Sequence, residues 1–129
     1  MKLREIMKSS PWTVTEITTL GHAHQLMTQN HIRHLPVIRD GKLIGILSER
    51  DILEYRATTA FREDWWRAPV SVAMVAQPQT AGPDDSLTEV AGRLAAAKIG
   101  AMPIVERGAL LGIVTVTDVL EAEVASAMA

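Results

Sequence analysis

A hydroxyl and a carboxylate recur at one spacing in two places of this 129-residue chain. Ser48 stands three positions before Asp51, and Thr115 stands three positions before Asp118. Each pair follows a short apolar run and precedes helix-forming residues, so it falls where a strand turns into a helix. A hydroxyl and an acid at that point form a capping box, which stabilises a helix by about 1 kcal/mol. The same position exposes free N–H groups, and a carboxylate there can accept hydrogen bonds from both hydroxyls of a ribose.

The two pairs belong to a repeat that covers most of the chain. A shift of 67 residues aligns 3–53 with 70–120 without a gap. Identical pairs include Met7 and Met74, Pro36 and Pro103, Gly45 and Gly112, and Asp51 and Asp118. Two copies are too few for a solenoid. They predict two similar lobes related by a pseudo-twofold axis, with equivalent surfaces facing one cleft.

Each copy is predicted to run strand, helix, strand, strand, helix. The expected elements of the first copy are a strand at 12–15, a helix opened by Thr18 or Thr19, strands at 34–38 and 43–47, and a helix over 49–56. Asp40-Gly41 favours a tight hairpin between the two central strands, because glycine accepts a positive φ. In the second copy, Ser86 and Glu89 predict a capping box for a helix over 87–98.

Composition excludes several classes of protein. The formal net charge is −2 and the pI is near 6.1, so no basic field favours nucleic acid or an anionic membrane. The absence of cysteine excludes disulfides and thiolate catalysis. The N-terminus has no apolar segment typical of a signal peptide, and no apolar run approaches the roughly 18 residues of a membrane span. We therefore expect a cytoplasmic protein that binds neither nucleic acid nor membrane.

The ordered set of motifs resembles the tandem CBS-domain family, also called the Bateman module. It is carried by IRHLPVIRDGKLIGILSERDIL at 32–53 and IGAMPIVERGALLGIVTVTDVL at 99–120. The resemblance implies an α+β fold of two β-α-β-β-α CBS repeats, packed through their sheets with pseudo-twofold symmetry. The repeats would span 1–58 and 70–129, with 59–69 as a linker.

The resemblance also implies a function, which is to sense an adenosine ligand in the cleft between the repeats. AMP, ADP, ATP or a related adenosyl compound would be the ligand, and no cofactor would be required. By analogy with the family, Asp51 with Ser48 and Asp118 with Thr115 would hold ribose or phosphate. The strand before each junction would line the base or the phosphates, through Ile32, Arg33 and His34 in the first copy and Ile99, Gly100 and Ala101 in the second.

The two copies differ in charge at these positions. The first carries Arg33, His34 and Arg50, where the second carries Gly100, Ala101 and Thr117. Arginine makes charge-assisted and often bidentate bonds to phosphate, so we expect the positive side of the site in the first copy. Both arginines are equally compatible with an ordinary solvated surface, and Glu49 offsets part of their charge.

A different class of function is a CBS-fold interaction or scaffold module with empty clefts. Residues 54–69 hold Tyr55, Phe61, Trp65 and Trp66. These aromatic side chains either cover apolar surface between the lobes or form a partner or dimer contact, since exposed tryptophan pairs mark interfaces. Stacking on a ligand base is a third, less favoured role. In the scaffold module, Trp65 and Trp66 would be the docking surface. The family resemblance further implies a homodimer and a regulated partner protein that the sequence does not name.

A third reading is a metal-binding regulator, because all four histidines fall close together, at His22, His24, His31 and His34. On a helix the first two point about 200° apart, and no cysteine or ordered acid accompanies them, so we expect no metal site. Catalysis is poorly supported as well, since no nucleophile elbow, Walker loop or zincin helix is present. We therefore expect a binding module and not an enzyme.

Overall fold

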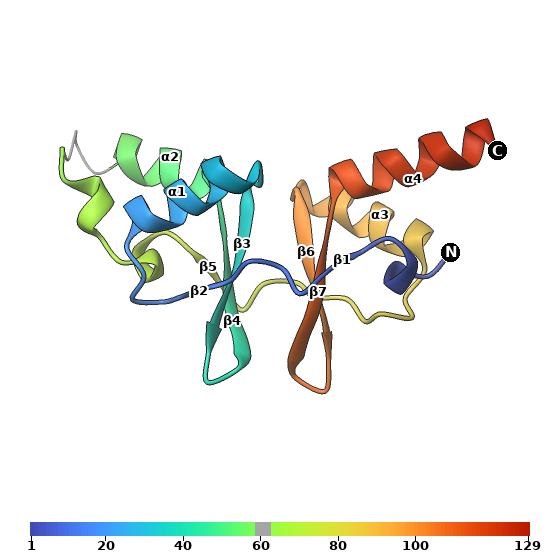
Figure 1. Ribbon diagram of the computed structural model, residues 1–129, viewed down its shortest axis with the longest axis horizontal. Coiled ribbons are helices and arrows are strands. Elements are labelled where there is room, and N and C mark those ends of the chain that lie inside the picture. Colours follow the sequence, from blue (N-terminus) through green and yellow to red (C-terminus); the bar gives the residue numbers. More distant parts are fainter. Residues whose placement is uncertain (59–62) are drawn as a thin grey trace. The chain divides into compact units, whose positions relative to one another are not determined.

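The computed structural model describes residues 1–58 and 63–129 (Figure 1). In chain order the elements are the 3-10 helix η1 (Leu3–Glu5), β1 (Lys8–Ser9), β2 (Val14–Thr15), α1 (Leu20–Asn30), β3 (His34–Arg39), β4 (Lys42–Ser48), α2 (Glu49–Thr58), the 3-10 helices η2 (Trp65–Arg67) and η3 (Val70–Val72), β5 (Val75–Ala76), α3 (Leu87–Ala97), β6 (Ala101–Glu106), β7 (Ala109–Thr115) and α4 (Val116–Met128). Each predicted strand and helix of the first copy is present with small shifts at its ends.

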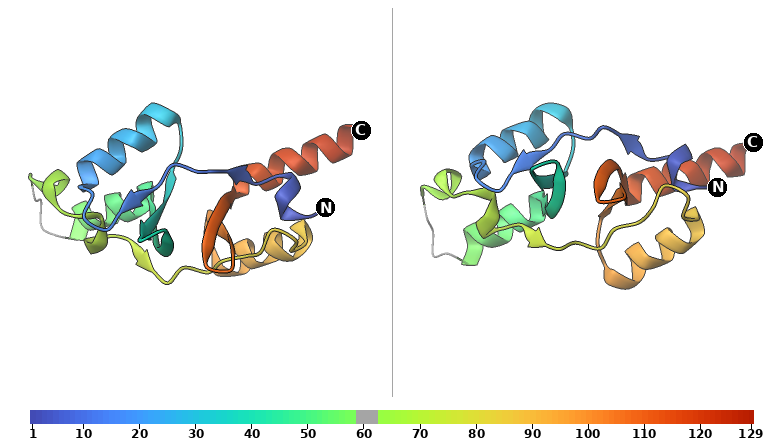
Figure 2. Two further views of the ribbon diagram at one scale, coloured as in Figure 1. Left: turned by 60° about the horizontal axis from the view of Figure 1, so that its bottom comes forward. Right: turned by 90° about the horizontal axis from the view of Figure 1, so that it is seen from below.

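The chain forms two compact units that are not divided as the sequence copies are. Unit 1 comprises Met1–Pro11 and Gln79–Ala129, and unit 2 comprises Trp12–Pro78. The leading segment of each copy therefore belongs to the unit built around the other copy. Figure 2 shows this for unit 1, where η1 (dark blue) lies beside the chain that leads into α3 (yellow), and the Leu3 N–H donates to the Asp85 carbonyl.

Unit 2 is a small sheet covered by α1 and α2. Its strands lie in the order β5, β4, β3, β2, with β2 parallel to β3 and the other neighbours antiparallel. The apolar side chains of α1 recur at helical spacing, and Leu20, Ala23 and Met27 are buried as that spacing predicts. They join a core cluster that also includes Val14, Leu35, Val37, Leu47, Ile52 and Val70.

Unit 1 repeats this plan with β1, β7 and β6 in its sheet, and with α3 and α4. Both strand pairs are antiparallel, and Ala81 adds a parallel bridge to Ile104. The core cluster includes Leu3, Leu87, Val90, Leu94, Met102, Ile104 and Val114. Leu3 is fully buried among side chains of the second copy, so the N-terminal segment is part of the core of this unit.

The turn between β3 and β4 agrees with the sequence prediction, and the turn between β6 and β7 has the same conformation. Asp40 and Gly41 have φ values of 51° and 77°, and Arg107 and Gly108 repeat them at 53° and 81°. Two consecutive residues with positive φ make the type I′ turn, whose twist matches that of the flanking strands. Each hairpin thereby aligns the start of one strand with the end of the next.

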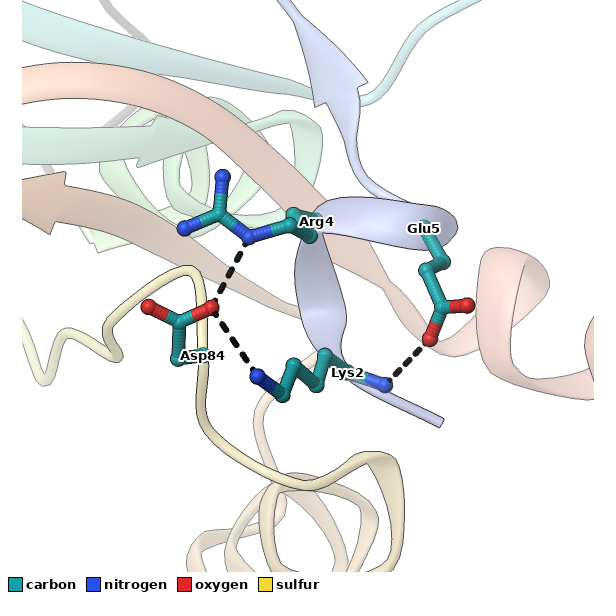
Figure 3. Close-up of polar contacts among 4 residues, drawn as sticks. All are labelled: Lys2, Arg4, Glu5 and Asp84. Atoms are coloured by element: carbon teal, nitrogen blue, oxygen red, sulfur yellow. Dashed lines mark hydrogen bonds and ion pairs between the residues drawn. The ribbon is translucent and has the colours of Figure 1, made fainter.

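Ion pairs link the N-terminal segment to the loop before α3 (Figure 3). The Arg4 Nε atom donates to Asp84 Oδ1 at 2.8 Å, and Lys2 Nζ lies 3.6 Å from the same oxygen. The hydrogen bond from Arg4, helped by the charges of Arg4 and Lys2, lowers the pKa of Asp84. All three side chains are exposed, and exposed pairs contribute little to stability. Burial of Leu3 and the backbone hydrogen bonds from Leu3 to Asp85 and from Arg4 to Pro83 attach the segment as well.

None of the helices in the described ranges 1–58 and 63–129 combines the length and the apolar character needed to cross a bilayer.

Candidate ligand site at the strand-to-helix junctions

In unit 2, Ser48 and Asp51 stand where β4 turns into α2. The Ser48 N–H donates to Asp51 Oδ2 at 2.8 Å, and the Asp51 N–H donates to Ser48 Oγ at 3.0 Å. These two bonds are the capping box that the spacing predicts. Asp51 is only half-buried, and its second carboxylate oxygen has no hydrogen-bond or ion-pair partner among the described residues of unit 2.

In unit 1, Thr115 and Asp118 repeat the arrangement where β7 turns into α4. The Thr115 N–H donates to Asp118 Oδ2 at 2.9 Å, and the Asp118 N–H donates to Thr115 Oγ1 at 3.1 Å. Asp118, however, is only 6% exposed. A carboxylate this deeply buried is stable because its oxygens are hydrogen-bonded or paired with charge.

The first strand of each hairpin, β3 in unit 2 and β6 in unit 1, begins beside the junction at the end of the second strand. The Glu49 N–H donates to the Arg33 carbonyl at 2.9 Å, and the Val116 N–H donates to the Gly100 carbonyl at 3.0 Å. Across the paired strands, His34 lies opposite Ser48 and Ala101 lies opposite Thr115. The two segments that the family resemblance assigned to one ligand are therefore neighbours within each unit.

The remaining predicted residues divide into exposed and core-facing ones. Arg33, Arg50, Gly100 and Thr117 are exposed beside the junctions. Ile32 and Ile99 are half-buried and pack against the cores of unit 2 and unit 1 respectively. Their part in holding a base remains a prediction, while their part in packing is established.

The junction of unit 2 contains a titratable side chain, His34, where unit 1 has Ala101. Burial lowers the pKa of His34 below its ordinary value of about 6.5. The carboxylate of Asp51 opposes that shift in the pKa, and the charge of Arg33 adds to it. The imidazole is consequently neutral at pH 7, and it can donate or accept a hydrogen bond without adding charge.

Lys8 is a residue of the site that the sequence analysis did not single out. It lies on β1, and its Nζ atom is 3.6 Å from Asp118 Oδ1. The 67-residue shift aligns Lys8 with Val75 on β5, so unit 2 has no cation at the matching place. Comparison of the two leading strands for charge was the signal in the sequence that could have identified it.

Two glycines explain how the leading strands come so close. A Cβ atom on Gly112 would lie 2.7 Å from the Lys8 carbonyl oxygen, and one on Gly45 would lie 2.8 Å from Met74 Sδ. Both distances are too short for real contacts. Gly112 is therefore required where β1 pairs with β7, because the obstacle is a backbone oxygen. At Gly45, where β5 pairs with β4, the obstacle is a flexible methionine side chain, which would have to shift.

The aromatic residues of 54–69 are in part accounted for. Trp65 packs against the core of unit 2, with His24 edge-on at 5.9 Å between ring centroids and the Arg56 guanidinium 4.6 Å from the ring. Trp66 stays 46% exposed. Phe61 lies outside the described residues.

The histidines do not assemble with other ligands. In residues 1–58 and 63–129, no group of three or more His, Cys, Asp or Glu side chains could hold a metal ion.

Comparison with known proteins places this architecture in a family. The CBS domain family matches the chain twice, over residues 3–58 and 70–125. The chain therefore belongs to the CBS domain family and carries a tandem pair of these domains. This result confirms the predicted family and the predicted α+β fold.

A curated relative of similar size matches most of this chain in sequence. The CBS domain-containing protein YhcV of Bacillus subtilis (strain 168) is 32% identical over 116 residues, which is 90% of this chain and 81% of the relative. Two other curated relatives are much longer, and this chain spans 14% and 22% of their lengths.

Solved structures show the same fold. The CBS domain pair of protein MJ0100, in complex with 5′-methylthioadenosine and S-adenosyl-L-methionine, has a TM-score of 0.88 at 23% identity and covers 98% of each chain. The structure of CBSX2 in complex with AMP has a TM-score of 0.83 at 23% identity, again over 98% of each chain. At this identity the likeness establishes the fold alone.

Proposed function

We propose that this protein is a regulatory module that senses an adenine nucleotide, AMP, ADP or ATP, or a related adenosyl compound. The observation that carries the proposal is the pairing, in each unit, of a hydroxyl and a carboxylate at a strand-to-helix junction in a tandem CBS chain. A carboxylate fixed there can accept hydrogen bonds from ribose hydroxyls, and Ser48 and Thr115 lie beside it. Similar folds bound to AMP and to S-adenosyl-L-methionine support the choice of ligand class.

The mechanism would be a shift in population between two arrangements of the chain. A ligand changes such an equilibrium only by its difference in affinity for the two arrangements. No catalytic step is part of this proposal, and no cofactor is required. The regulated partner would recognise the arrangement that the ligand favours, and we place the module in the cytoplasm.

A thermal-shift panel tests this function. AMP, ADP, ATP, NADH and S-adenosyl-L-methionine would each be titrated against the full chain, with and without magnesium. A ligand at 100 times its Kd should add about 2.7 kcal/mol to the free energy of unfolding. The double variant Asp51→Ala/Asp118→Ala should lose that added stability, measured against the variant's own unliganded melting temperature. No shift with any of these compounds at millimolar concentration would reject the proposal.

A homodimer is the second part of the proposal, and α4 supports it. Val116, Leu120, Val124 and Met128 follow one another at four-residue spacing and are between 42% and 82% exposed. Four residues of helix make slightly more than one turn, so these side chains form one stripe. A continuous exposed apolar stripe of this kind is typical of an association surface. We propose that a second copy of this chain covers it.

The alternative function is a scaffold or interaction module with empty ligand sites. Trp12 and Trp66, both in unit 2, are 56% and 46% exposed, and exposed tryptophan is enriched where proteins bind one another. A negative ligand panel, together with a partner interaction lost on Trp66→Ala, would favour this alternative.

A further inference from the structure

Asp51 and Asp118 are equivalent in the sequence repeat, but their surroundings differ. Both oxygens of Asp118 are engaged, Oδ2 by the Thr115 N–H and Oδ1 by Lys8, and the residue is nearly inaccessible. Asp51 is half-buried and uses only Oδ2, in its bond to Ser48. An incoming hydroxyl therefore finds an open acceptor at Asp51 and an occupied, covered one at Asp118.

One difference between the leading strands accounts for the pairing of Asp118 Oδ1 with a cation. Lys8 lies opposite Ile113 on β7, and its counterpart Val75 lies opposite Ile46 on β4, at the matching register. The register places an ammonium beside one carboxylate and an alkyl side chain at the same position in the other unit. Val75 is half-exposed, so its side chain has room for a larger replacement.

The charges around the two junctions point the same way. Arg33 and Arg50 are exposed beside the junction of unit 2, and their counterparts in unit 1, Gly100 and Thr117, are neutral. Guanidinium groups are the best side-chain donors to phosphate. Unit 2 thus offers an open acceptor for the ribose and cations for the phosphate, whereas in unit 1 Lys8 is paired with Asp118.

We propose that the Asp51 junction alone binds the nucleotide, and that the Lys8–Asp118 ion pair keeps the Asp118 junction closed to ligand. This inference rests on the proposed function, because it takes the ligand to be an adenine nucleotide. It assigns one ligand to each chain and gives Lys8 a role in site selection that the family motif does not contain.

Two reciprocal substitutions test the role of the lysine by isothermal titration calorimetry with AMP and with adenosine. Val75→Lys would add an ammonium beside Asp51, and we expect it to weaken binding of both probes at least tenfold. Simple charge attraction would instead strengthen AMP binding, so the sign separates the two effects. Lys8→Ala should add a second, weaker binding event, and Asp118→Asn in that background should remove it.

The site assignment is tested by comparing Asp51→Asn with Asp118→Asn, since asparagine keeps the size and the capping acceptor. We expect one AMP per wild-type chain, loss of binding in Asp51→Asn and unchanged affinity in Asp118→Asn. Two equivalent sites per chain, or binding that depends on Asp118 and not on Asp51, would overturn the inference while leaving the proposed function standing.

Binding unaffected by Val75→Lys would overturn the role of the lysine. This variant changes only a half-exposed residue, so it tests that role even if an aspartate variant misfolds. A wild-type chain that binds neither probe, nor any compound of the thermal-shift panel, would remove the proposed function and this inference together.

Discussion

At the residue scale, the two copies of the hydroxyl–carboxylate motif form the same capping hydrogen bonds but have different surroundings. The spacing of Ser48 with Asp51 and of Thr115 with Asp118 predicted capping boxes, and both are present. Capping depends on residues three positions apart, so the sequence contains all the information it needs. The cation that pairs with Asp118 comes from Lys8, more than a hundred residues away along the chain.

His34 should make stability depend on pH. Burial holds its pKa below about 6.5, so in acid the unfolded chain takes up a proton that the folded chain resists. The contribution to stability is present above the unfolded value and is lost as pH falls from about 6.5 toward the lowered pKa. The free energy of unfolding of wild type should therefore fall more steeply between pH 7.5 and 5.5 than that of His34→Gln.

The measurement is urea denaturation at several pH values across that range. Asp51 and Arg33 are the charged groups that act on His34, and both remain in the variant. His22→Gln, which removes an exposed histidine from α1, is the matched control. Parallel pH profiles for wild type and His34→Gln would contradict the prediction.

At the element scale, α1 and α4 differ in how much of their apolar surface is buried within their own unit. The apolar pattern of α1 faces the core of its own unit, as its spacing predicted. The pattern of α4 includes a second stripe, formed by Val116, Leu120, Val124 and Met128, that the core of unit 1 does not cover. Periodicity identifies an apolar face, but only the packed unit shows which faces remain exposed.

If a second copy covers that stripe, a charge within it should separate the dimer. Leu120→Glu is expected to convert a dimer into a monomer, because the carboxylate would be buried in an apolar contact without a partner. Ser126→Glu places the same charge away from the stripe on the same helix and should leave the dimer intact. Sedimentation velocity distinguishes the two states, and an unchanged sedimentation coefficient for Leu120→Glu would reject this surface.

At the scale of the whole molecule, the exchange of leading segments links the two sequence copies. Leu3 belongs to the first copy but is buried in unit 1, and its counterpart Val70 belongs to the second copy but is buried in unit 2. Each unit is completed only by residues from the other copy. A substitution in the leading segment of one copy should consequently destabilise the unit built around the other copy.

Leu3→Ala should destabilise unit 1 by about 2–5 kcal/mol, as large-to-small changes in a core do. Hydrogen exchange should show lost protection in β6 and β7 with little change in β3 and β4. Val70→Ala is the reciprocal variant, with a smaller loss that is concentrated in β3 and β4. Equal loss in both units, or loss that follows the sequence copies, would contradict the observed division.

The sequence by itself determined the repeat, the hairpins, the helix caps and the family, because each depends on local spacing or on an ordered pattern along the chain. It also identified the two junctions and the strand starts that meet them. Only the tertiary structure decided which leading segment completes which unit. It also decided that Lys8 pairs with Asp118, whereas one carboxylate oxygen of Asp51 is left available to a ligand. Those outcomes arise from contacts between residues that are distant in the chain. The burial of each side chain and the charges near it depend on which residues the fold brings next to it.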